Sequence, residues 1–317
     1  MSALGIIIYI NIMLDIQEII QRFKEKPYLR RMSSKNIAKR LHKDYRDVVK
    51  ARKTLYKKSN KPLKVLIFDL ETSPMQAYVW SRWNQNISLD ATISEWFIIC
   101  WSAKWLYSNE VIGDVLTPEE IVKEDDCRIV KSLWNIINEA DIVVAHNGNR
   151  ADIPWMNTRF IINGLIPPKP YFSVDTCLVA RKQFNFSSNK LDALATYFGL
   201  ANKMDTNFEL WKKCLHGDPI SLKYMLEYNK MDVKILEEVY LKLRPWIKNH
   251  PNIGNILSSR QHLCSKCGSE HIEKIEGEYY FTSVSKYELF RCKECGSISR
   301  GRNNLNKNTN KITTVEK

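Results

Sequence analysis

A short apolar run that ends in two carboxylates constrains this chain more than any other feature. Residues 65–72 read Val-Leu-Ile-Phe-Asp-Leu-Glu-Thr. This composition, rich in β-branched and large apolar residues, predicts a buried strand. Asp69 and Glu71 are two positions apart, so they would project from one face of that strand. Carboxylates at the end of a buried strand need a partner, and a divalent metal ion is the usual one. A strand that simply runs into a polar turn is the alternative.

Two further acidic motifs follow in order. Residues 142–145 predict a second strand, and the polar loop after it delivers Asp152 near the start of a helix that runs to about Ile162. A helical pattern over about 221–243 places Tyr228 and Asp232, four residues apart, on one helix face. The chain therefore offers four carboxylates and one phenol from three separate segments.

This set resembles the DEDD superfamily of 3′→5′ exonucleases, in its tyrosine-containing branch. The matching residues, in chain order, are Asp69 and Glu71 for the first motif, Asp152 for the second, and Tyr228 with Asp232 for the third. The segment from Asn147 to Trp155 is most similar to the proofreading domain of family B DNA polymerases. The resemblance covers roughly residues 63–245. It departs at Ala151, where the family usually has an aromatic residue.

The resemblance implies a fold, a reaction and a set of ions. The fold is a ribonuclease H-like mixed α/β sheet flanked by helices. Asp69, Glu71 and Asp232 would hold two Mg²⁺ or Mn²⁺ ions, with Asp152 as an outer ligand. One ion would lower the pKa of the attacking water and the other would stabilise the leaving 3′-oxygen. Tyr228 would position that water. The implied function is 3′→5′ exonuclease activity, with DNA favoured over RNA.

The segments between the motifs complete this expected sheet. Residues 96–107 predict a strand that pairs with 111–115, and residues 118–139 predict one helix. Residues 172–174 predict a short strand, after which Asp175 would cap the next helix rather than join the acidic set. Residues 188–192 would open a further helix. The chain has no Gly-x-Gly-x-x-Gly, P-loop, nucleophile-elbow or kinase motif.

Several residues outside the acidic set are candidate substrate contacts. Trp80, Arg82 and Trp83 lie just beyond the carboxylate strand and are of the types that stack on or clamp a single strand. Tryptophans that pack under a lid are the alternative. Lys190 is a candidate contact to a backbone phosphate, with a solvated lysine as the alternative. Asn147, in the second motif, is a further candidate.

The net charge of +13 lies mostly near the N-terminus. Residues 1–62 hold 16 Lys and Arg against five Asp and Glu, whereas 63–260 are near neutral, with 22 against 23. Residues 15–58 predict three short helices that resemble a helix-turn-helix, with a turn at 42–44. We expect this 1–62 module to contact nucleic acid phosphates. Protein docking and a merely solubilising N-terminus are the alternatives.

Four cysteines near the C-terminus form the second strong motif. They are arranged as two C-x-x-C pairs, each followed by Gly, and they are Cys264, Cys267, Cys292 and Cys295. This spacing predicts one structural Zn²⁺ in a module that resembles a zinc ribbon over 260–300. Disulfides are the alternative. Residues 301–317 are rich in Asn, Lys and Thr, which predicts a disordered tail.

The remaining expectations concern location and a competing function. Residues 1–14 are apolar but too short to span a bilayer and poor as a signal peptide, and Met13 is an alternative start. The scattered cysteines predict a cytoplasmic protein of a bacterial cell or virus-infected host, with no membrane association. Replication or repair proteins are candidate partners. A non-catalytic nucleic-acid-binding or regulatory protein built on an exonuclease-like scaffold is the competing function.

Overall fold

The computed structural model describes residues 15–23, 25–26, 29, 32–55, 62–200, 204, 206–257 and 262–306, without the side chains of 52–55. The chain divides into two compact units, Met1–Pro62 and Leu63–Lys317. Our predictions for residues 1–14 and 307–317 lie outside the described residues. Among the described residues, no helix is long and apolar enough to cross a membrane.

The first unit is a small helical cluster. Residues 15–23 are helical, followed by α2 (Ser34–Leu41) and α3 (Tyr45–Leu55). The Ser33 side chain caps α2, and His42 ends it with a φ of 51°, which makes the expected turn before α3. Apolar side chains from all three segments share one core with Leu29, which lies between the first two; the core residues of the segments are Ile16, Ile19, Phe23, Ile37, Val48 and Ala51.

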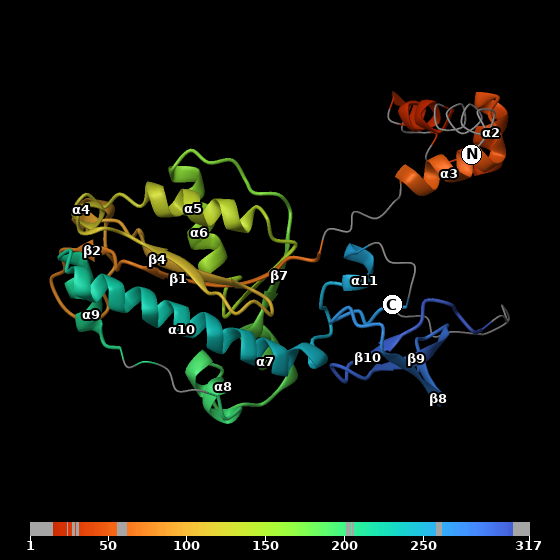
Figure 1. The fold of residues 1–317 in the computed structure, drawn as a ribbon. Helices are drawn as coiled ribbons and strands as arrows, with labels where there is room; N and C mark the ends of the chain where they lie inside the picture. Colours follow the sequence, from red (N-terminus) through yellow and green to blue (C-terminus); the bar gives the residue numbers. More distant parts are fainter. Residues whose placement is uncertain are drawn as a thin grey trace. The chain divides into compact units, whose positions relative to one another are not determined.

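The second unit is built on a mixed five-stranded sheet (Figure 1). The strands are β1 (Val65–Thr72), β4 (Ile98–Trp105), β5 (Ile112–Val115), β6 (Ile142–Ala145) and β7 (Phe172–Asp175), in the order β5-β4-β1-β6-β7. β4 is antiparallel to both β1 and β5, whereas β6 is parallel to both β1 and β7. The structure confirms the strands predicted at 65–72, 142–145 and 172–174. It also confirms that the strand predicted within 96–107 pairs with the one predicted at 111–115.

Alternation along β1 divides the packing between the two faces of the sheet. Leu66, Phe68 and Leu70 lie in one core with α5 (Cys127–Ile137) and α6 (Asp152–Ile162). Val65 and Ile67 lie in another, with side chains of α7 (Thr176–Gln183), α8 (Leu191–Tyr197) and α10. Helix α10 (Pro219–Leu243) is long and packs across β4 and β1, after α9 (Phe208–Leu215). The odd positions of β1, which include Asp69 and Glu71, therefore share the face that carries Ile67.

The single helix predicted over 118–139 is wrong. The segment forms α4 (Pro118–Val122) and α5, and Glu124 between them has a φ of 54°. Asp126 explains the break, because its carboxylate is buried and is shared by the Arg159 guanidinium and the Ile98 backbone N–H. A continuous helix would turn this side chain away from partners that lie 28 and 33 residues distant in the sequence.

A small hairpin interrupts the path from β1 to β4. It is formed by β2 (Gln76–Ala77) and β3 (Thr92–Ser94), and the segment between them carries Trp80 and Trp83. These two side chains are 102% and 80% exposed. The alternative in which they pack under a lid is therefore wrong for this structure.

The C-terminal part is a separate three-stranded sheet, in the order β10-β9-β8. Its strands are β8 (Ile272–Phe281), β9 (Lys286–Cys292) and β10 (Ile298–Arg300), preceded by α11 (Ile253–Ile256). The Ile253 backbone N–H donates to the Ser265 carbonyl, which ties α11 to the first cysteine pair. Residues 301–306, which we expected to begin the tail, continue along β9 through Gly301 and Leu305 N–H bonds.

Candidate active site

The β1 carboxylates face helix α10. In the antiparallel register, Asp69 lies opposite Ser102 and Glu71 opposite Cys100, and both partners on β4 are fully buried. The Cys100 thiol reaches the Met225 carbonyl on α10. Asp69 and Glu71 themselves remain partly exposed, because they stand where β1 leaves the apolar core. Their strand thus fixes two carboxylates under a helix.

Helix α10 brings the third motif to the same place. Tyr228 and Asp232 are one helical turn apart and are 5% and 4% exposed. One carboxylate oxygen from each of Asp69, Glu71 and Asp232 lies within 4.8 Å of the other two. Three converging carboxylates form an all-oxygen donor set, which is the set that Mg²⁺ and Mn²⁺ prefer. These residues therefore fit the predicted divalent ions.

Asn229 is a neighbour of this trio that the sequence analysis missed. Its side chain is fully buried, and its Nδ2 donates to Asp69 Oδ2 at 2.7 Å. Its Oδ1 is buried without a hydrogen-bond partner among the described residues. Since it follows Tyr228 directly, only the helix–sheet packing reveals that it points at β1. Asn229 holds one oxygen of Asp69 and so orients the carboxylate.

Asp152 lies in the same pocket but outside the trio. It is the first residue of α6 and is 4% exposed. Burial, with a smaller contribution from Asp175, raises the pKa of its carboxyl to about 7. Backbone N–H groups, including that of Leu70, lower it in part. Asp152 therefore gains a proton near neutral pH far more readily than an ordinary aspartate.

Asp175 builds the loop that precedes Asp152. Its carboxylate accepts the backbone N–H groups of Asn147, Asn149 and Leu178 at 3.0 to 3.1 Å. The predicted helix cap is thus confirmed, and Asp175 also fixes the loop. Asn147 has a φ of 62°, and a Cβ on Gly148 would lie 2.3 Å from that of Ala145. This tight turn requires glycine at position 148 and delivers Asp152 to the pocket.

His146 joins the second motif to the segment before α8. Its Nδ1 lies 2.9 Å from Thr176 Oγ1, and its Nε2 lies 2.9 Å from the Asn189 carbonyl oxygen. The Asn189 carbonyl also accepts from the Cys177 thiol. A carbonyl can only accept, so Nε2 carries the proton that it donates. These contacts give His146 a structural role, because it links the end of β6 to α7 and to the segment before α8.

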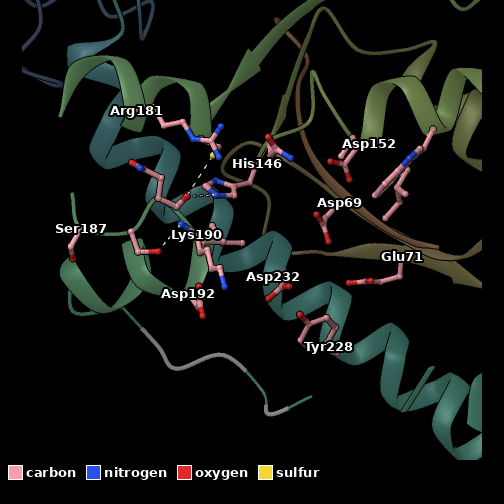
Figure 2. Close-up of a pocket in the computed structure, with 18 residues that line it drawn as sticks. Asp69, Glu71, His146, Asp152, Arg181, Ser187, Lys190, Asp192, Tyr228 and Asp232 are labelled. Carbon is pink, nitrogen blue, oxygen red and sulfur yellow. Dashed lines mark hydrogen bonds between the residues drawn. The ribbon is translucent and has the colours of Figure 1, made fainter. Parts of the chain in front are cut away.

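One pocket of about 580 Å³ joins these elements (Figure 2). It is lined by all five residues of the acidic motifs, by Asn147 and Lys190, and by residues that we did not predict, which include Ala151, Trp155, Cys177, Arg181, Ser187, Ser188, Asn189 and Asp192. Trp80, Arg82 and Trp83 do not line it. Trp155 lies one helical turn after Ala151, and its ring centroid is 6.2 Å from that of Trp96. The pocket therefore has an aromatic ring near position 151, where the family usually has an aromatic residue.

The four C-terminal cysteines form a second candidate metal centre. Their Sγ atoms lie within 4.8 Å of one another. The Cys264–Cys295 and Cys267–Cys292 separations are 3.6 and 3.5 Å. These are far from a disulfide bond of about 2.05 Å. They approach the ~3.8 Å expected between thiolates in tetrahedral zinc, whose Zn–S bonds are about 2.3 Å. The cluster and its small sheet fit a zinc ribbon.

Comparison with known proteins adds two similarities. Residues 114–244 match the family model described as the RNase_H superfamily. This match covers less than half of the chain, and it includes Asp152, Tyr228 and Asp232 but begins after β1. No curated protein matches this chain.

Among solved structures, the chain is similar to the family B DNA polymerase from the hyperthermophilic archaeon Pyrobaculum calidifontis, with 18% sequence identity and a TM-score of 0.44. The similarity covers 58% of this chain and 25% of that one, so the chain spans about a quarter of the polymerase's length. The mixed sheet with its flanking helices, and the family match over 114–244, identify the core of this protein as a ribonuclease H-like fold.

Proposed function

We propose that this protein is a metal-dependent 3′→5′ exonuclease that hydrolyses the terminal phosphodiester bond of DNA. The observation that carries the proposal is the convergence of Asp69, Glu71 and Asp232 within 4.8 Å. They converge at one end of a pocket that also contains Asp152 and Tyr228. Asp232 is more than 150 residues from Asp69 and Glu71 in the sequence, and three carboxylates have no structural need to meet in one half-buried cluster, because like charges in one site repel.

The acidic residues divide into two roles. Asp69, Glu71 and Asp232 would hold two divalent ions, and Asp152 would act as an outer ligand once it loses its proton. Bound ions supply polarisation of the attacking water and stabilisation of the leaving oxygen. Asn229 keeps Asp69 oriented through its 2.7 Å hydrogen bond. The half-buried cluster is therefore pre-arranged to receive cations and, with them, a phosphate.

Tyr228 and the pocket rim supply positioning. The Tyr228 hydroxyl would orient the attacking water rather than take its proton, since phenols are poor bases at neutral pH. Asn147 and the ring of Trp155 line the pocket beside Asp152 and would hold the terminal nucleotide. Stacking on an aromatic face tolerates every base, which suits an enzyme that removes nucleotides in sequence.

The experiment compares hydrolysis by the parent chain and two variants in Mg²⁺ or Mn²⁺. We expect Asp232→Ala to abolish nucleotide release. Asp192→Ala is the matched control, because Asp192 lines the same pocket outside the trio. It should keep activity within a few-fold of the parent. Full activity of Asp232→Ala would overturn the assignment.

The flanking modules extend the proposal. We assign residues 1–62 to nucleic acid binding, 63–250 to the nuclease domain and 260–300 to a zinc ribbon that carries one structural Zn²⁺. Removal of residues 1–62 should preserve cleavage of short oligomers and flatten the dependence of long-DNA binding on salt, because fewer counterions are released. Equal salt slopes for both proteins would make a protein partner the better assignment for this module.

A further inference from the structure

The pocket has a second end whose chemistry differs from that of the acidic trio. Arg181 on α7 and Lys190, just before α8, line the same 580 Å³ pocket as the carboxylates. Figure 2 shows Arg181, Ser187 and Lys190 on the other side of His146 from Asp69, Asp152 and Glu71. Both cations are exposed. The pocket is thus acidic at one end and bears two cations at the other.

These cations have no carboxylate partner among the described residues. Some other cations of the same unit are paired. Arg159 binds Asp126, Arg128 binds Asp114 and Glu120, and Lys104 binds Glu237. Asp192 lines the pocket, but its Oδ1 accepts the Ala193 backbone N–H at 2.9 Å. Arg181 and Lys190 are therefore available for an anion that enters from outside.

The segment that ends at Lys190, residues 184–190, is held in place by contacts near both of its ends. The rings of Phe184 and Phe186 stack at 5.2 Å, and Phe186 stacks on Tyr197 at 5.4 Å. At the other end of this segment, the Asn189 carbonyl is held by His146 and by the Cys177 thiol. Residues 184–190 are thus anchored on both sides, which lowers the entropy that a ligand must overcome on binding.

We propose that Arg181 and Lys190, with the hydroxyls of Ser187 and Ser188, form a subsite for the phosphate next upstream of the scissile one. This inference rests on the proposed nuclease function and specifies its substrate as a single-stranded 3′ end with at least two phosphodiesters. A volume of about 580 Å³ lies in the range that holds one drug-sized molecule, which matches the size of the end of one strand. With the scissile phosphate at the acidic trio, a strand that follows the pocket would place its neighbouring phosphate toward the cations.

The test uses oligomers that differ by one phosphate. A dinucleotide has only the scissile phosphodiester, whereas a trinucleotide also fills the proposed subsite. For the double variant Arg181→Ala/Lys190→Ala, we expect KM for the trinucleotide and longer single strands to rise roughly ten- to a hundredfold. The kcat should stay within about threefold, and KM for the dinucleotide should match the parent. The salt slope of binding should fall by about 1, because one or two phosphate contacts are lost.

The control variant removes two positive charges, as the test variant does, but from outside the pocket. Lys123 and Lys131 are exposed and lie at the end of α4 and on α5, away from the pocket lining. Lys123→Ala/Lys131→Ala should leave the KM values for both lengths unchanged. An equal effect of both double variants, or no effect of Arg181→Ala/Lys190→Ala at any length, would overturn the subsite. Tight binding of blunt duplex would overturn the single-strand specificity.

A second measurement separates the subsite from the nuclease function. Binding of fluorescein-labelled dinucleotide and trinucleotide is followed by anisotropy in Ca²⁺, a divalent ion with the same preference for oxygen ligands. The parent should bind the trinucleotide more tightly, and the Arg181→Ala/Lys190→Ala variant should lose that difference. This result would support the subsite even if the parent released no nucleotide. Identical binding of both lengths by the parent would refute it.

Discussion

The buried carboxyl of Asp152 provides a quantitative test of the site. Its pKa is raised from 3.8 to about 7, chiefly by burial. A difference of about three pKa units corresponds to roughly 4 kcal/mol, at ~1.36 kcal/mol per unit. This is an upper bound, because relaxation and water entry reduce it. The charged form of Asp152 is thus a substantial cost to the metal-free fold.

The direction in which the free energy of unfolding changes with pH follows from proton binding. Between about pH 4 and pH 7, an unfolded chain has lost the proton of Asp152 while the folded chain keeps it. The folded state therefore binds more protons, and its contribution to the free energy of unfolding falls as pH rises through this window. Above pH 7 the loss is complete. Asp152→Asn removes the titration, so this variant should gain up to about 4 kcal/mol at pH 8 and lose that component of the slope.

The free energy of unfolding can be measured at pH 5.5 and pH 8 by hydrogen exchange of the β1 and β6 amides. The exchange rates are corrected for the effect of pH on intrinsic exchange. Catalytic ions should be removed on a chelating resin, with the zinc content checked afterwards, because strong chelators would also strip the cysteine site. Asp126→Asn is the control, since it breaks a buried pair with Arg159 and should destabilise by about 3–5 kcal/mol. If Asp152→Asn kept the parent's pH slope, the reasoning about Asp152 would be refuted.

Three further predictions concern two residues of α10 beside the trio and the zinc ribbon. Tyr228→Phe should bind metal and DNA normally but turn over roughly ten- to a thousandfold more slowly in single-turnover assays, since it loses only a positioning hydroxyl; parent-like rates would make Tyr228 a packing residue. Asn229→Leu should raise the Mn²⁺ concentration for half-maximal activity about tenfold, with kcat at saturating Mn²⁺ little changed. The reason is that a hydrogen bond to a charged group contributes about 1.5–3 kcal/mol. An unchanged Mn²⁺ dependence would rule out a role of Asn229 in orienting Asp69. Purified protein should hold one Zn²⁺, and Cys264→Ser should remove exchange protection from 262–306 while β1 stays protected; full zinc content in that variant would exclude the four-cysteine site.

Local pattern predicted most of the elements of the sheet. The run 65–72 and the strand 142–145 are apolar enough to be placed without tertiary information, and Asp175 caps α7 as its sequence position suggests. The break at 123–126 was not predictable in this way. It depends on Asp126 meeting Arg159 and Ile98, which are distant in sequence. Tertiary pairing there overrides a continuous helical pattern.

The candidate site likewise contains residues that could be predicted from the sequence and residues that could not. Asp69, Glu71, Tyr228 and Asp232 have informative spacings within one strand or one helix, so sequence alone nominates them. Asn229 and Arg181 have no such spacing. Their positions depend on how α10 crosses β1 and how α7 lines the pocket. The exposure of Trp80 likewise reflects the β2–β3 hairpin, whose two short strands carry almost no periodic signal.

The polarity of digestion tests the central claim most directly. One single-stranded DNA oligomer is labelled at its 3′ end in one sample and at its 5′ end in another, and both are digested in Mn²⁺. We expect the 3′ label to appear at once as a mononucleotide, while the 5′-labelled strand shortens in single-nucleotide steps. Asp69→Ala should stop both. Early release of the 5′ label, internal fragments, or no hydrolysis by the parent chain at any Mn²⁺ concentration would contradict a 3′→5′ exonuclease.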